Sequence, residues 1–435
     1  METAQKLTIG PNEPISIKQS LFLGLQHVLA MDVYVVPFII ATAVSASADQ
    51  ATALIQSCFL GAGIASLIQV LFFLKLPVCQ GPSFVPVGAI IGLYFGNGNF
   101  DNVFGASLVG GLILAILGVT GIIKKMIAEY IPRIVSGTII MIVGLSLLPA
   151  AFNSNIYVQS DVLSMHQNIL LAVISGSLLI VFSMIGYYSP KTGNLLRIGS
   201  VILAIAIGTV VAALMGGYNF DSVTSAGWFT RPMVAFVDYP LGFDLSSILT
   251  MLIIYLVLTA ETTGTWYAVS SVIDETITDH QLNMGIIGEG IGCMIAALVG
   301  ATPVTGYSTN AGIISVTGVA SKRVFVGASI WFIILSFLGK FSALINSIPS
   351  SVIGGIFSVV TMIILLAGFK VIKEEPFDER QTYIVGLPII VAMGLIFLPV
   401  EVKQSAPTMI QYLLDSPIAI SAIISMLMNK LLPEI

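Results

Sequence analysis

Residues Thr302–Arg323 read TPVTGYSTNAGIISVTGVASKR, and this stretch decides the fold. It begins with proline, small and hydroxyl residues, continues as a short apolar segment, AGIISVTGVA, and ends on two positive charges. A helix needs about 20 apolar residues to span a bilayer, so the apolar part is too short. It nevertheless lies between two long hydrophobic segments, and lipid cannot satisfy the free backbone N–H groups at its start. The stretch therefore predicts an interrupted helix, which in transporters marks the binding site.

The composition is that of a protein embedded in a membrane. Of the 435 residues, 56% are hydrophobic and only 9% charged, and the mean hydropathy is +1.00. Soluble proteins carry about 25% charged residues, so we predict an all-α polytopic membrane protein. No basic tract indicates a nucleic-acid partner, no signal peptide opens the chain, and the three cysteines lack metal-ligand spacing. We therefore expect no nucleic acid, no metal and no cofactor.

Apolar runs bounded by polar, proline or glycine residues predict fourteen transmembrane segments. Two of them, 84–96 and 310–319, are short, and we expect each to cross as extended chain plus a half-helix. The others are expected at 21–46, 51–75, 104–123, 131–152, 168–188, 196–217, 244–271, 281–301, 324–346, 350–371, 381–399 and 407–429.

The distribution of Lys and Arg predicts that both termini are cytoplasmic, in the cell (inner) membrane. With this orientation only Arg231, Lys340 and Lys403 lie outside. The cytoplasmic set is Lys6, Lys18, Lys75, Lys124, Lys125, Arg133, Lys191, Arg197, Lys322, Arg323, Lys370, Lys373, Arg380 and Lys430. Removing either short segment from the count would spoil this bias.

The two short segments occupy equivalent places. Each is third in its set of seven, and each follows a step to proline: LPVCQGPSFVPVG from Leu76 and TPVTGYSTNAG from Thr302. An odd number of segments per repeat inverts the second copy. We therefore predict two inverted seven-segment repeats, a design that places the binding site at the paired interrupted helices.

Three carboxylates fall deep within predicted spans: Asp32, Glu261 and Glu289. An unpaired carboxylate in the bilayer is costly unless it is protonated or faces water, so each is a functional candidate. Glu261 is the strongest, because Thr265 lies one turn further on the same face and Gly264 permits close approach of another backbone. Glu261 could accept two N–H groups of a planar ligand or hold a proton; the alternative is a structural carboxyl that caps a neighbouring helix.

The other candidates have a functional and a structural interpretation each. Glu289, between two glycines, either handles a proton or holds the broken segments together. Asp32 shares a helix with His27, which indicates a polar role, although a lone histidine is commonly a satisfied core residue. Phe84 and Tyr307 sit at the two breaks, where they could stack on a planar ligand or simply pack.

Five motifs resemble the nucleobase–ascorbate transporter family (nucleobase:cation symporter 2 type), which includes the bacterial xanthine and uracil permeases. They are Gln26-His27, Ser83-Phe84, AETTG at Ala260–Gly264, GEG at Gly288–Gly290 and TNAGIISVTGVASKR from Thr309. The last contains the family signature, with Asn310, Gly312 and Thr317 in register. The resemblance extends over nearly the whole chain in length, segment count and motif order.

This resemblance implies a uracil-permease-like fold with two domains. After a cytoplasmic lead-in (1–20), residues 21–123 and 244–346 would form a core domain, and residues 124–217 and 350–435 a gate domain. The substrate would lie between the third and tenth segments and be held by the eighth. Relatives also suggest a homodimer formed through the gate domain.

By the same resemblance Glu261 matches the substrate-binding glutamate, and Glu289 matches a position that is usually Asp. Phe84 matches an aromatic contact with the substrate, and Tyr307 and Ser308 flank the signature. Asn310 is expected to cap the half-helix and to contact the ligand.

The sequence departs from the family pattern at two positions. Thr309 stands where relatives have Glu or Gln before the signature asparagine, and Thr265 stands where uracil or xanthine permeases have His or Asp. Both replaced groups would hydrogen-bond a base or help carry a proton, and Asp32 is a candidate compensation. The tail VTGVASKR is closer to purine than to uracil members.

We therefore expect a secondary active transporter that imports a nucleobase by proton symport with alternating access. A purine such as xanthine or urate is favoured, and uracil is the other candidate. The proton-coupling candidates are Glu261, Glu289, Asp32 and His27. Two alternatives stay open: an anion transporter of the sulfate-permease type, and a sodium-coupled family member with a non-nucleobase substrate. An enzyme is not expected, because His27 and Glu261 alone make no catalytic constellation and no phosphate-binding loop is present.

Overall fold

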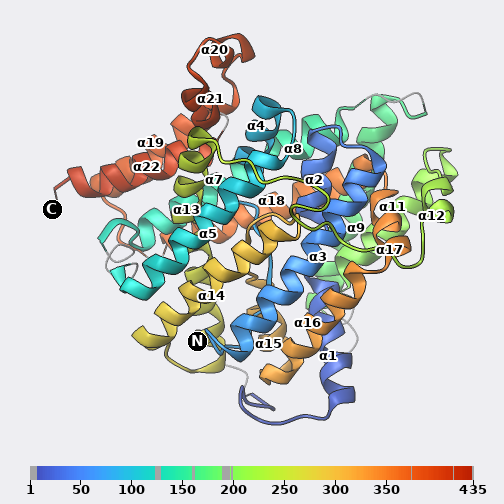
Figure 1. The fold of residues 1–435 in the computed structure, drawn as a ribbon, viewed down its shortest axis with the longest axis horizontal. Coiled ribbons are helices and arrows are strands. Elements are labelled where there is room, and N and C mark those ends of the chain that lie inside the picture. Colours follow the sequence, from blue (N-terminus) through green and yellow to red (C-terminus); the bar gives the residue numbers. More distant parts are fainter. Residues whose placement is uncertain are drawn as a thin grey trace.

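The computed structural model describes residues 7–122, 129–158, 162–188, 196, 199–373, 375–414 and 416–433. Five residues used for the predicted orientation lie outside these ranges: Lys6, Lys124, Lys125, Lys191 and Arg197. The described helices, shown in Figure 1, are α1 Ile17–Ala30, α2 Val35–Ala43, α3 Ala48–Leu71, α4 Val87–Asn97, α5 Asp101–Thr120, α7 Arg133–Ser146, α8 Leu148–Ala151, α9 Met165–Tyr188, α11 Ser200–Leu214, α12 Asp221–Ser225, α13 Leu245–Ile273, α14 Asp279–Leu298, α15 Thr309–Thr317, α16 Lys322–Ser336, α17 Gly339–Asn346, α18 Ser350–Lys373, α19 Glu379–Ile396, α20 Val400–Gln404, α21 Thr408–Leu414 and α22 Pro417–Leu431. A π-helix, Phe152–Ile156, follows α8, and the strands are β1 Gln80–Pro82 and β2 Val304–Gly306.

The fold is that of an all-helical multi-span membrane protein, as predicted. Among the described residues, nine helical stretches are long and apolar enough to cross a bilayer, and three shorter apolar helices accompany them: α4, α11 and α22. The short helices α4 and α15 account for part of the difference from fourteen segments, because neither is long enough to span alone.

Among the described residues, four predicted helices are each divided into two elements. The expected helix 21–46 ends at Ala30 and restarts at Val35, so Asp32 lies in a break rather than within a helix. Similar breaks divide 131–152, 324–346 and 407–429. Three of the four restarts carry a proline in their first turn, Pro37, Pro149 and Pro417. Proline is tolerated there because its missing N–H would have no helical partner, whereas it cannot continue the preceding helix.

The two short segments meet at a strand pair inside the bundle. β1 and β2 are antiparallel, with Gln80 opposite Gly306 and Pro82 opposite Val304. Because the strands are antiparallel, the helices that follow them, α4 and α15, leave the pair in opposite directions. Each short segment is therefore extended chain followed by a short helix, as predicted.

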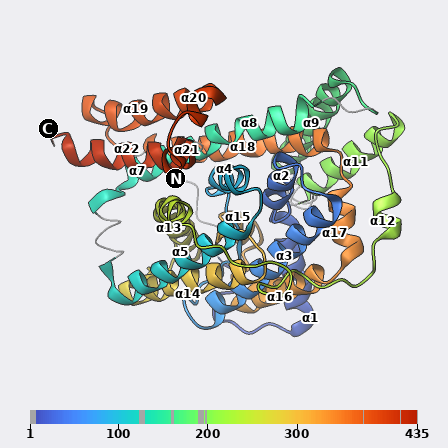
Figure 2. The ribbon, with the colours of Figure 1, turned by 45° about the horizontal axis from the view of Figure 1, so that its top comes forward.

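The long helices form two layers (Figure 2). One layer contains α1, α3, α5, α14 and α16, which pack closely on one another, and the other contains α7, α9, α11, α18, α19 and α22. Helices α4, α13 and α15 lie between the layers in Figure 2. The strand pair thus starts both half-helices at the boundary between two groups of helices.

Close backbone packing holds the first layer together, and one glycine tests it. A Cβ at Gly24 of α1 would lie 2.5 Å from the backbone nitrogen of Ala328 in α16. We expect Gly24→Ala to destabilise the protein by about 1–3 kcal/mol, because backbone cannot move aside as a flexible side chain can. In α19 a Cβ at Gly386 would meet nothing within 4 Å. Gly386→Ala should therefore leave the melting temperature of purified protein unchanged or slightly raised; equal melting of both variants would contradict the packing argument.

Candidate functional site

The carboxylate of Glu261 lies beside the start of the α4 half-helix. Ser83, directly after β1, donates its hydroxyl hydrogen to Glu261 Oε2 at 2.6 Å. The same hydroxyl oxygen accepts the backbone N–H of Val85 at 3.1 Å. A hydroxyl has one hydrogen to donate. Because the Ser83 oxygen accepts from Val85 N–H, the hydroxyl hydrogen points to the carboxylate. Glu261 as a residue is half-buried.

Glu261 lies on helix α13, and the residues next to it on this helix contact β2. The hydroxyl of Thr262 accepts the backbone N–H of Gly306 at 3.1 Å. Thr265 is buried and packs against the same glycine, so it does not face the open side of α13. Gly264 is exposed, and a Cβ there would meet nothing within 4 Å. The expectation that Gly264 permits close backbone approach is therefore wrong: this face of α13 is open.

Asn310 connects three parts of the site, but it does not cap the half-helix as predicted. Its amide nitrogen donates to the carbonyls of Tyr307 (2.8 Å) and Cys79 (3.3 Å), and its amide oxygen lies 3.0 Å from His27 Nδ1. Since a carbonyl oxygen only accepts, His27 Nδ1 carries the hydrogen. The residue at the cap position is Ser308, whose side chain makes no capping bond. Asn310 is fully buried and joins the first helix to both breaks.

The start of α15 has a buried and an open side. Tyr307 is buried, its ring covers Gly81 of the facing strand, and its hydroxyl donates to Pro82 O at 2.9 Å. Ser308 and Thr309 are exposed, as is Gly312 one turn further. Within α15 the first backbone N–H with a hydrogen bond is that of Asn310, which donates to Tyr307 O. The open side therefore offers the positive end of a helix, where unpaired N–H groups attract anions and acceptors.

Phe84 connects the first break to the other layer. Its ring stacks on Phe357 of α18, with centroids 5.8 Å apart and an interplanar angle of 19°. Both rings are buried. The contact places an aromatic pair next to the Ser83–Glu261 bond and across the boundary between the layers.

The three remaining predicted residues, His27, Asp32 and Glu289, lie at three other places. His27 is buried and packs on Phe325, with ring centroids 4.5 Å apart. Asp32 is half-buried in the α1–α2 break. Glu289 is buried behind the strand pair, where Gln69 donates to its Oε2 at 3.3 Å. The structure thus brings Glu261 to the open face but leaves Glu289 and His27 inside the first layer.

The described residues supply no ion pair that would hold these carboxylates in their places. Within the part of the chain that the structure describes, no Lys or Arg forms a salt bridge with Asp32, Glu261 or Glu289. A cavity of about 370 Å³ lies between α4 and the second layer, lined among others by Gly92, Asn153 and Ser416. None of the predicted site residues lines this cavity.

Three contributing residues were not assigned a role from sequence: Ser83, Gln69 and Phe357. Ser83 was visible in the Ser83-Phe84 motif, and Gln69 is a polar residue within the apolar helix α3, which is itself a signal. Phe357 had no signal, because it is one phenylalanine among the apolar residues of α18. Its contact depends on how the layers meet.

Together these features define the class of protein. Two interrupted segments meet at a buried strand pair within a multi-span bundle, which is the arrangement of a membrane transporter. The fold is similar to the transmembrane domain of the cyanobacterial bicarbonate transporter BicA (TM-score 0.59, 15% identity, 97% of this chain and 100% of that chain). It is also similar to the murine anion transporter Slc26a9 (TM-score 0.64, 12% identity, 94% of this chain and 68% of that chain). At such low identity the likeness concerns the fold alone.

The chain belongs to the xanthine/uracil permease family: the model of this family, described as "Permease family", matches residues 18–401. A putative purine permease of Clostridium perfringens is 28% identical over 99% of this chain and 94% of its own length. The uric acid permease PucJ of Bacillus subtilis is 29% identical (86% and 83%), and the uracil permease of Bacillus caldolyticus 27% (96% and 93%). The predicted family is confirmed, and so is the prediction of a transporter rather than an enzyme.

Proposed function

We propose that this protein is a secondary active transporter that imports a nucleobase by proton symport with alternating access. The observation that carries the proposal is the Ser83–Glu261 bond, which ties the half-buried Glu261 to the start of the α4 half-helix. The neighbouring Thr262 is bonded to Gly306, just before the α15 half-helix. Relatives named for purines, uric acid, xanthine and uracil support a nucleobase as the substrate. A purine such as xanthine or urate is favoured, with uracil as the other candidate.

The geometry suits a planar base. Ser83 occupies one direction on Glu261 Oε2, and the rest of the carboxylate can accept two adjacent N–H groups of a base edge. Carbonyl oxygens on the other edge would face the exposed helix start at Ser308 and Thr309. Phe84 supplies an aromatic surface at one side. The substrate-binding set proposed is Glu261, Thr309, Asn310, Phe84, Tyr307, Ser308 and Thr265. Of these, Phe84, Asn310, Tyr307 and Thr265 would act from buried positions.

The two layers support a division into two domains. Residues 21–123 and 244–346 would form the core domain, and 124–217 and 350–435 the gate domain, as two inverted seven-segment repeats. The opposite directions of α4 and α15 support this division, and so does the position of α13 between the layers (Figure 2). The core would carry the site past the gate, and two copies would pair through the gate domain, with both termini cytoplasmic.

A proton is the proposed coupling ion. Carboxylates in a membrane without a cationic partner are stable when they are protonated or hydrated, which makes them carriers of protons. Glu261 is the first candidate because it also faces the substrate position. Asp32, His27 and Glu289 would assist from the α1–α2 break, the Asn310 contact and the Gln69 contact.

The test is uptake into proteoliposomes under an imposed inward proton gradient. Labelled xanthine, urate and uracil should accumulate, with the purines preferred, and labelled sulfate should not. A matched sodium gradient without a pH difference should drive little uptake. Sulfate accumulation would favour the anion transporter that the Slc26a9-like fold also permits, and uptake only with sodium would refute proton coupling.

Thr309→Gln is expected to tighten binding of xanthine-type bases about 2–10-fold. Thr309 is exposed at the helix start, and an amide makes more directional contacts than a hydroxyl, each contributing about 0.5–1.5 kcal/mol. Competition binding across a panel of bases measures the change. Ser315→Gln, at another exposed position on α15, is the control. If both variants leave the ligand profile unchanged, position 309 does not contact the substrate.

A further inference from the structure

The chain between α12 and α13, residues 226–243, forms a belt across the face of the bundle (Figure 1). We call it the 226–243 belt. Its backbone is bonded to the ends or upper turns of three helices of the first layer: Thr230 N to Phe337 O (3.1 Å), Met233 N to Ser57 Oγ (3.3 Å) and Ala235 N to Leu298 O (2.8 Å). These three hydrogen bonds fix the position of the loop along the axes of the helices.

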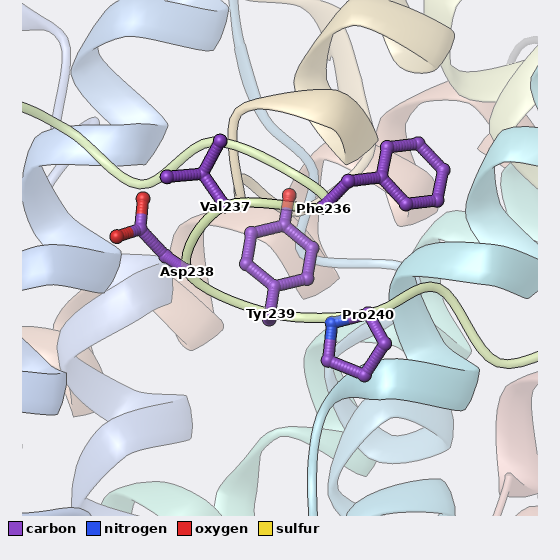
Figure 3. Close-up of a pocket in the computed structure, with 5 residues that line it drawn as sticks. All are labelled: Phe236, Val237, Asp238, Tyr239 and Pro240. Atoms are coloured by element: carbon purple, nitrogen blue, oxygen red, sulfur yellow. The ribbon is translucent and has the colours of Figure 1, made fainter.

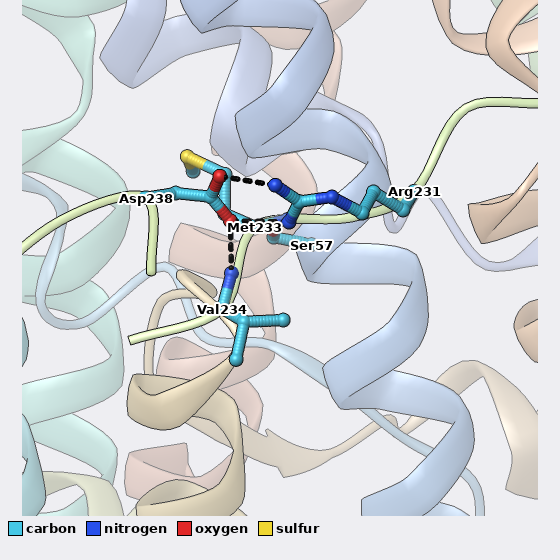
Figure 4. Close-up of polar contacts among 5 residues, drawn as sticks. All are labelled: Ser57, Arg231, Met233, Val234 and Asp238. Carbon is cyan, nitrogen blue, oxygen red and sulfur yellow. Dashed lines mark hydrogen bonds and ion pairs between the residues drawn. The ribbon is translucent and has the colours of Figure 1, made fainter. Parts of the chain in front are cut away.

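An ion pair closes the central turn of the belt (Figure 4). Arg231 donates from both terminal nitrogens to the two carboxylate oxygens of Asp238, at 2.5 and 2.7 Å, and Val234 N donates to the same carboxylate at 2.8 Å. The hydrogen bonds from Arg231 lower the pKa of the Asp238 carboxyl. Residues 232–237, PMVAFV, are all apolar, so the pair cancels the only charges of this turn.

The same turn directs its large apolar side chains outward. Phe236 has a φ of 65°, a region that bulky residues rarely adopt, and its N–H donates to Tyr239 O at 2.7 Å. Figure 3 shows the Phe236 ring pointing away from Tyr239, which turns inward to bond Ala297 O. Phe236 is 75% exposed and Val237 72%. Trp228 and Phe229, at the start of the belt, are 69% and 80% exposed.

The helices give the depth of the belt. Ser66 of α3 bonds both backbone groups of Gln80, so it marks the level of the strand pair from which the two half-helices leave in opposite directions. Ser57 precedes Ser66 by nine residues on the same helix, which at about 1.5 Å per residue places it about 14 Å from that level. The hydrocarbon core extends about 15 Å from the bilayer centre. Transporters hold their interrupted helices near the bilayer midplane. With the strand pair at that level, the belt would run close to the boundary between acyl chains and headgroups.

We propose that the 226–243 belt is a lipid-binding surface: Trp228, Phe229, Phe236 and Val237 insert into the headgroup–acyl boundary of the leaflet on the side where α4 ends. Grouped exposed apolar residues mark a partner surface, and aromatic side chains concentrate at the headgroup–acyl boundary of a bilayer. The closed Arg231–Asp238 pair lets the turn approach lipid without a net charge. The partner is phospholipid. By binding it, the belt would fix how deep the first layer of helices lies in the membrane.

The test attaches the fluorophore NBD to a single introduced cysteine in the full-length protein in liposomes. Phe236→Cys and, separately, Val237→Cys report on the belt. Glu401→Cys is the control, because Glu401 is exposed on α20, which packs on α21 and through it on the α4 side. The natural cysteines Cys58, Cys79 and Cys293 are buried, and unlabelled wild type verifies that they do not react. Monodisperse elution of each variant confirms folding.

We expect lipids with a nitroxide at acyl carbon 5 to quench the belt probes several-fold more than the Glu401 probe. Aqueous iodide should quench them several-fold less. Iodide quenching equal to that of the Glu401 probe, without nitroxide quenching, would place the belt in water and overturn the proposal. Protection from both quenchers would also overturn it, because the surface would then be covered by protein.

Discussion

A Glu261→Gln variant is expected to lose proton-driven accumulation of nucleobase entirely and to bind its substrate about 10–100-fold more weakly. The amide keeps the size of the side chain and can still accept from Ser83, but it cannot bind or release a proton. It also replaces one acceptor oxygen by a donor, and hydrogen bonds to a charged group contribute about 1.5–3 kcal/mol. Coupling should therefore be lost completely and binding only in part.

Exchange distinguishes these two effects. Counterflow of labelled base does not require the empty carrier to return, so the Gln variant should retain it at high substrate concentration. Uptake driven by a pH gradient and counterflow are measured in the same proteoliposomes, so that both rates refer to one amount of folded protein. If the Gln variant still accumulates substrate against its gradient, the coupling site is elsewhere, and Asp32 or Glu289 becomes the candidate.

Ser83→Ala is the matched control for this experiment. It removes the 2.6 Å hydrogen bond to Glu261 but leaves the titratable carboxylate in place. We expect weaker binding with accumulation still present, in contrast to Glu261→Gln. Loss of accumulation in Ser83→Ala as well would indicate that the position of the carboxylate, rather than its protonation, controls coupling.

The interrupted segments were predictable because their signal is local. An apolar run that is too short to span, preceded by proline and small residues, can be recognised without knowing any neighbour. Both runs, from Leu76 and from Thr302, fold as extended chain and a short helix. The breaks at Pro37 and Pro149 had a local signal too, but apolar residues on both sides hid it within longer hydrophobic runs.

The partners of the site residues were not predictable, because they depend on contacts between distant parts of the chain. Gln80 and Gly306 belong to two paired strands of three residues each, and strands this short have no recognisable sequence pattern. The register of that pair brings Ser83 to Glu261 and Asn310 to Cys79. Sequence therefore indicated candidate residues at each break but not which of them touch.

Glu289 illustrates the same limit. Its position between two glycines was compatible with proton handling and with holding the breaks together. The glycines are explained by packing: a Cβ at Gly288 would lie 2.5 Å from Gln69 Oε1, and one at Gly290 would lie 2.5 Å from the backbone of α5. Tight packing on both sides places Glu289 inside the first layer, away from the open face of α13.

Asn310→Ala is expected to lower both the stability of the protein and its transport at equal amounts of folded protein. The change removes three hydrogen bonds at a fully buried position. The carbonyls of Cys79 and Tyr307 each keep a backbone N–H, from Tyr307 and Asn310 respectively, so the main loss is at His27. A buried donor left without a partner costs about 1–3 kcal/mol.

Transport should fall more than tenfold, because Asn310 is the residue that ties the first helix to both breaks, and small displacements of binding groups reduce rates strongly. Thermal unfolding and uptake of purified Asn310→Ala are compared with those of Thr309→Ala. The side chain of Thr309, next to Asn310 in the sequence, is exposed, so Thr309→Ala should not change the melting temperature. Combining Asn310→Ala with His27→Ala tests the contact itself. The two changes should be less than additive, by about 0.5–3 kcal/mol, since each removes the same hydrogen bond. Full additivity would show that His27 and Asn310 stabilise the site independently, and the stability loss at position 310 would then have to come from its bonds to the two carbonyls.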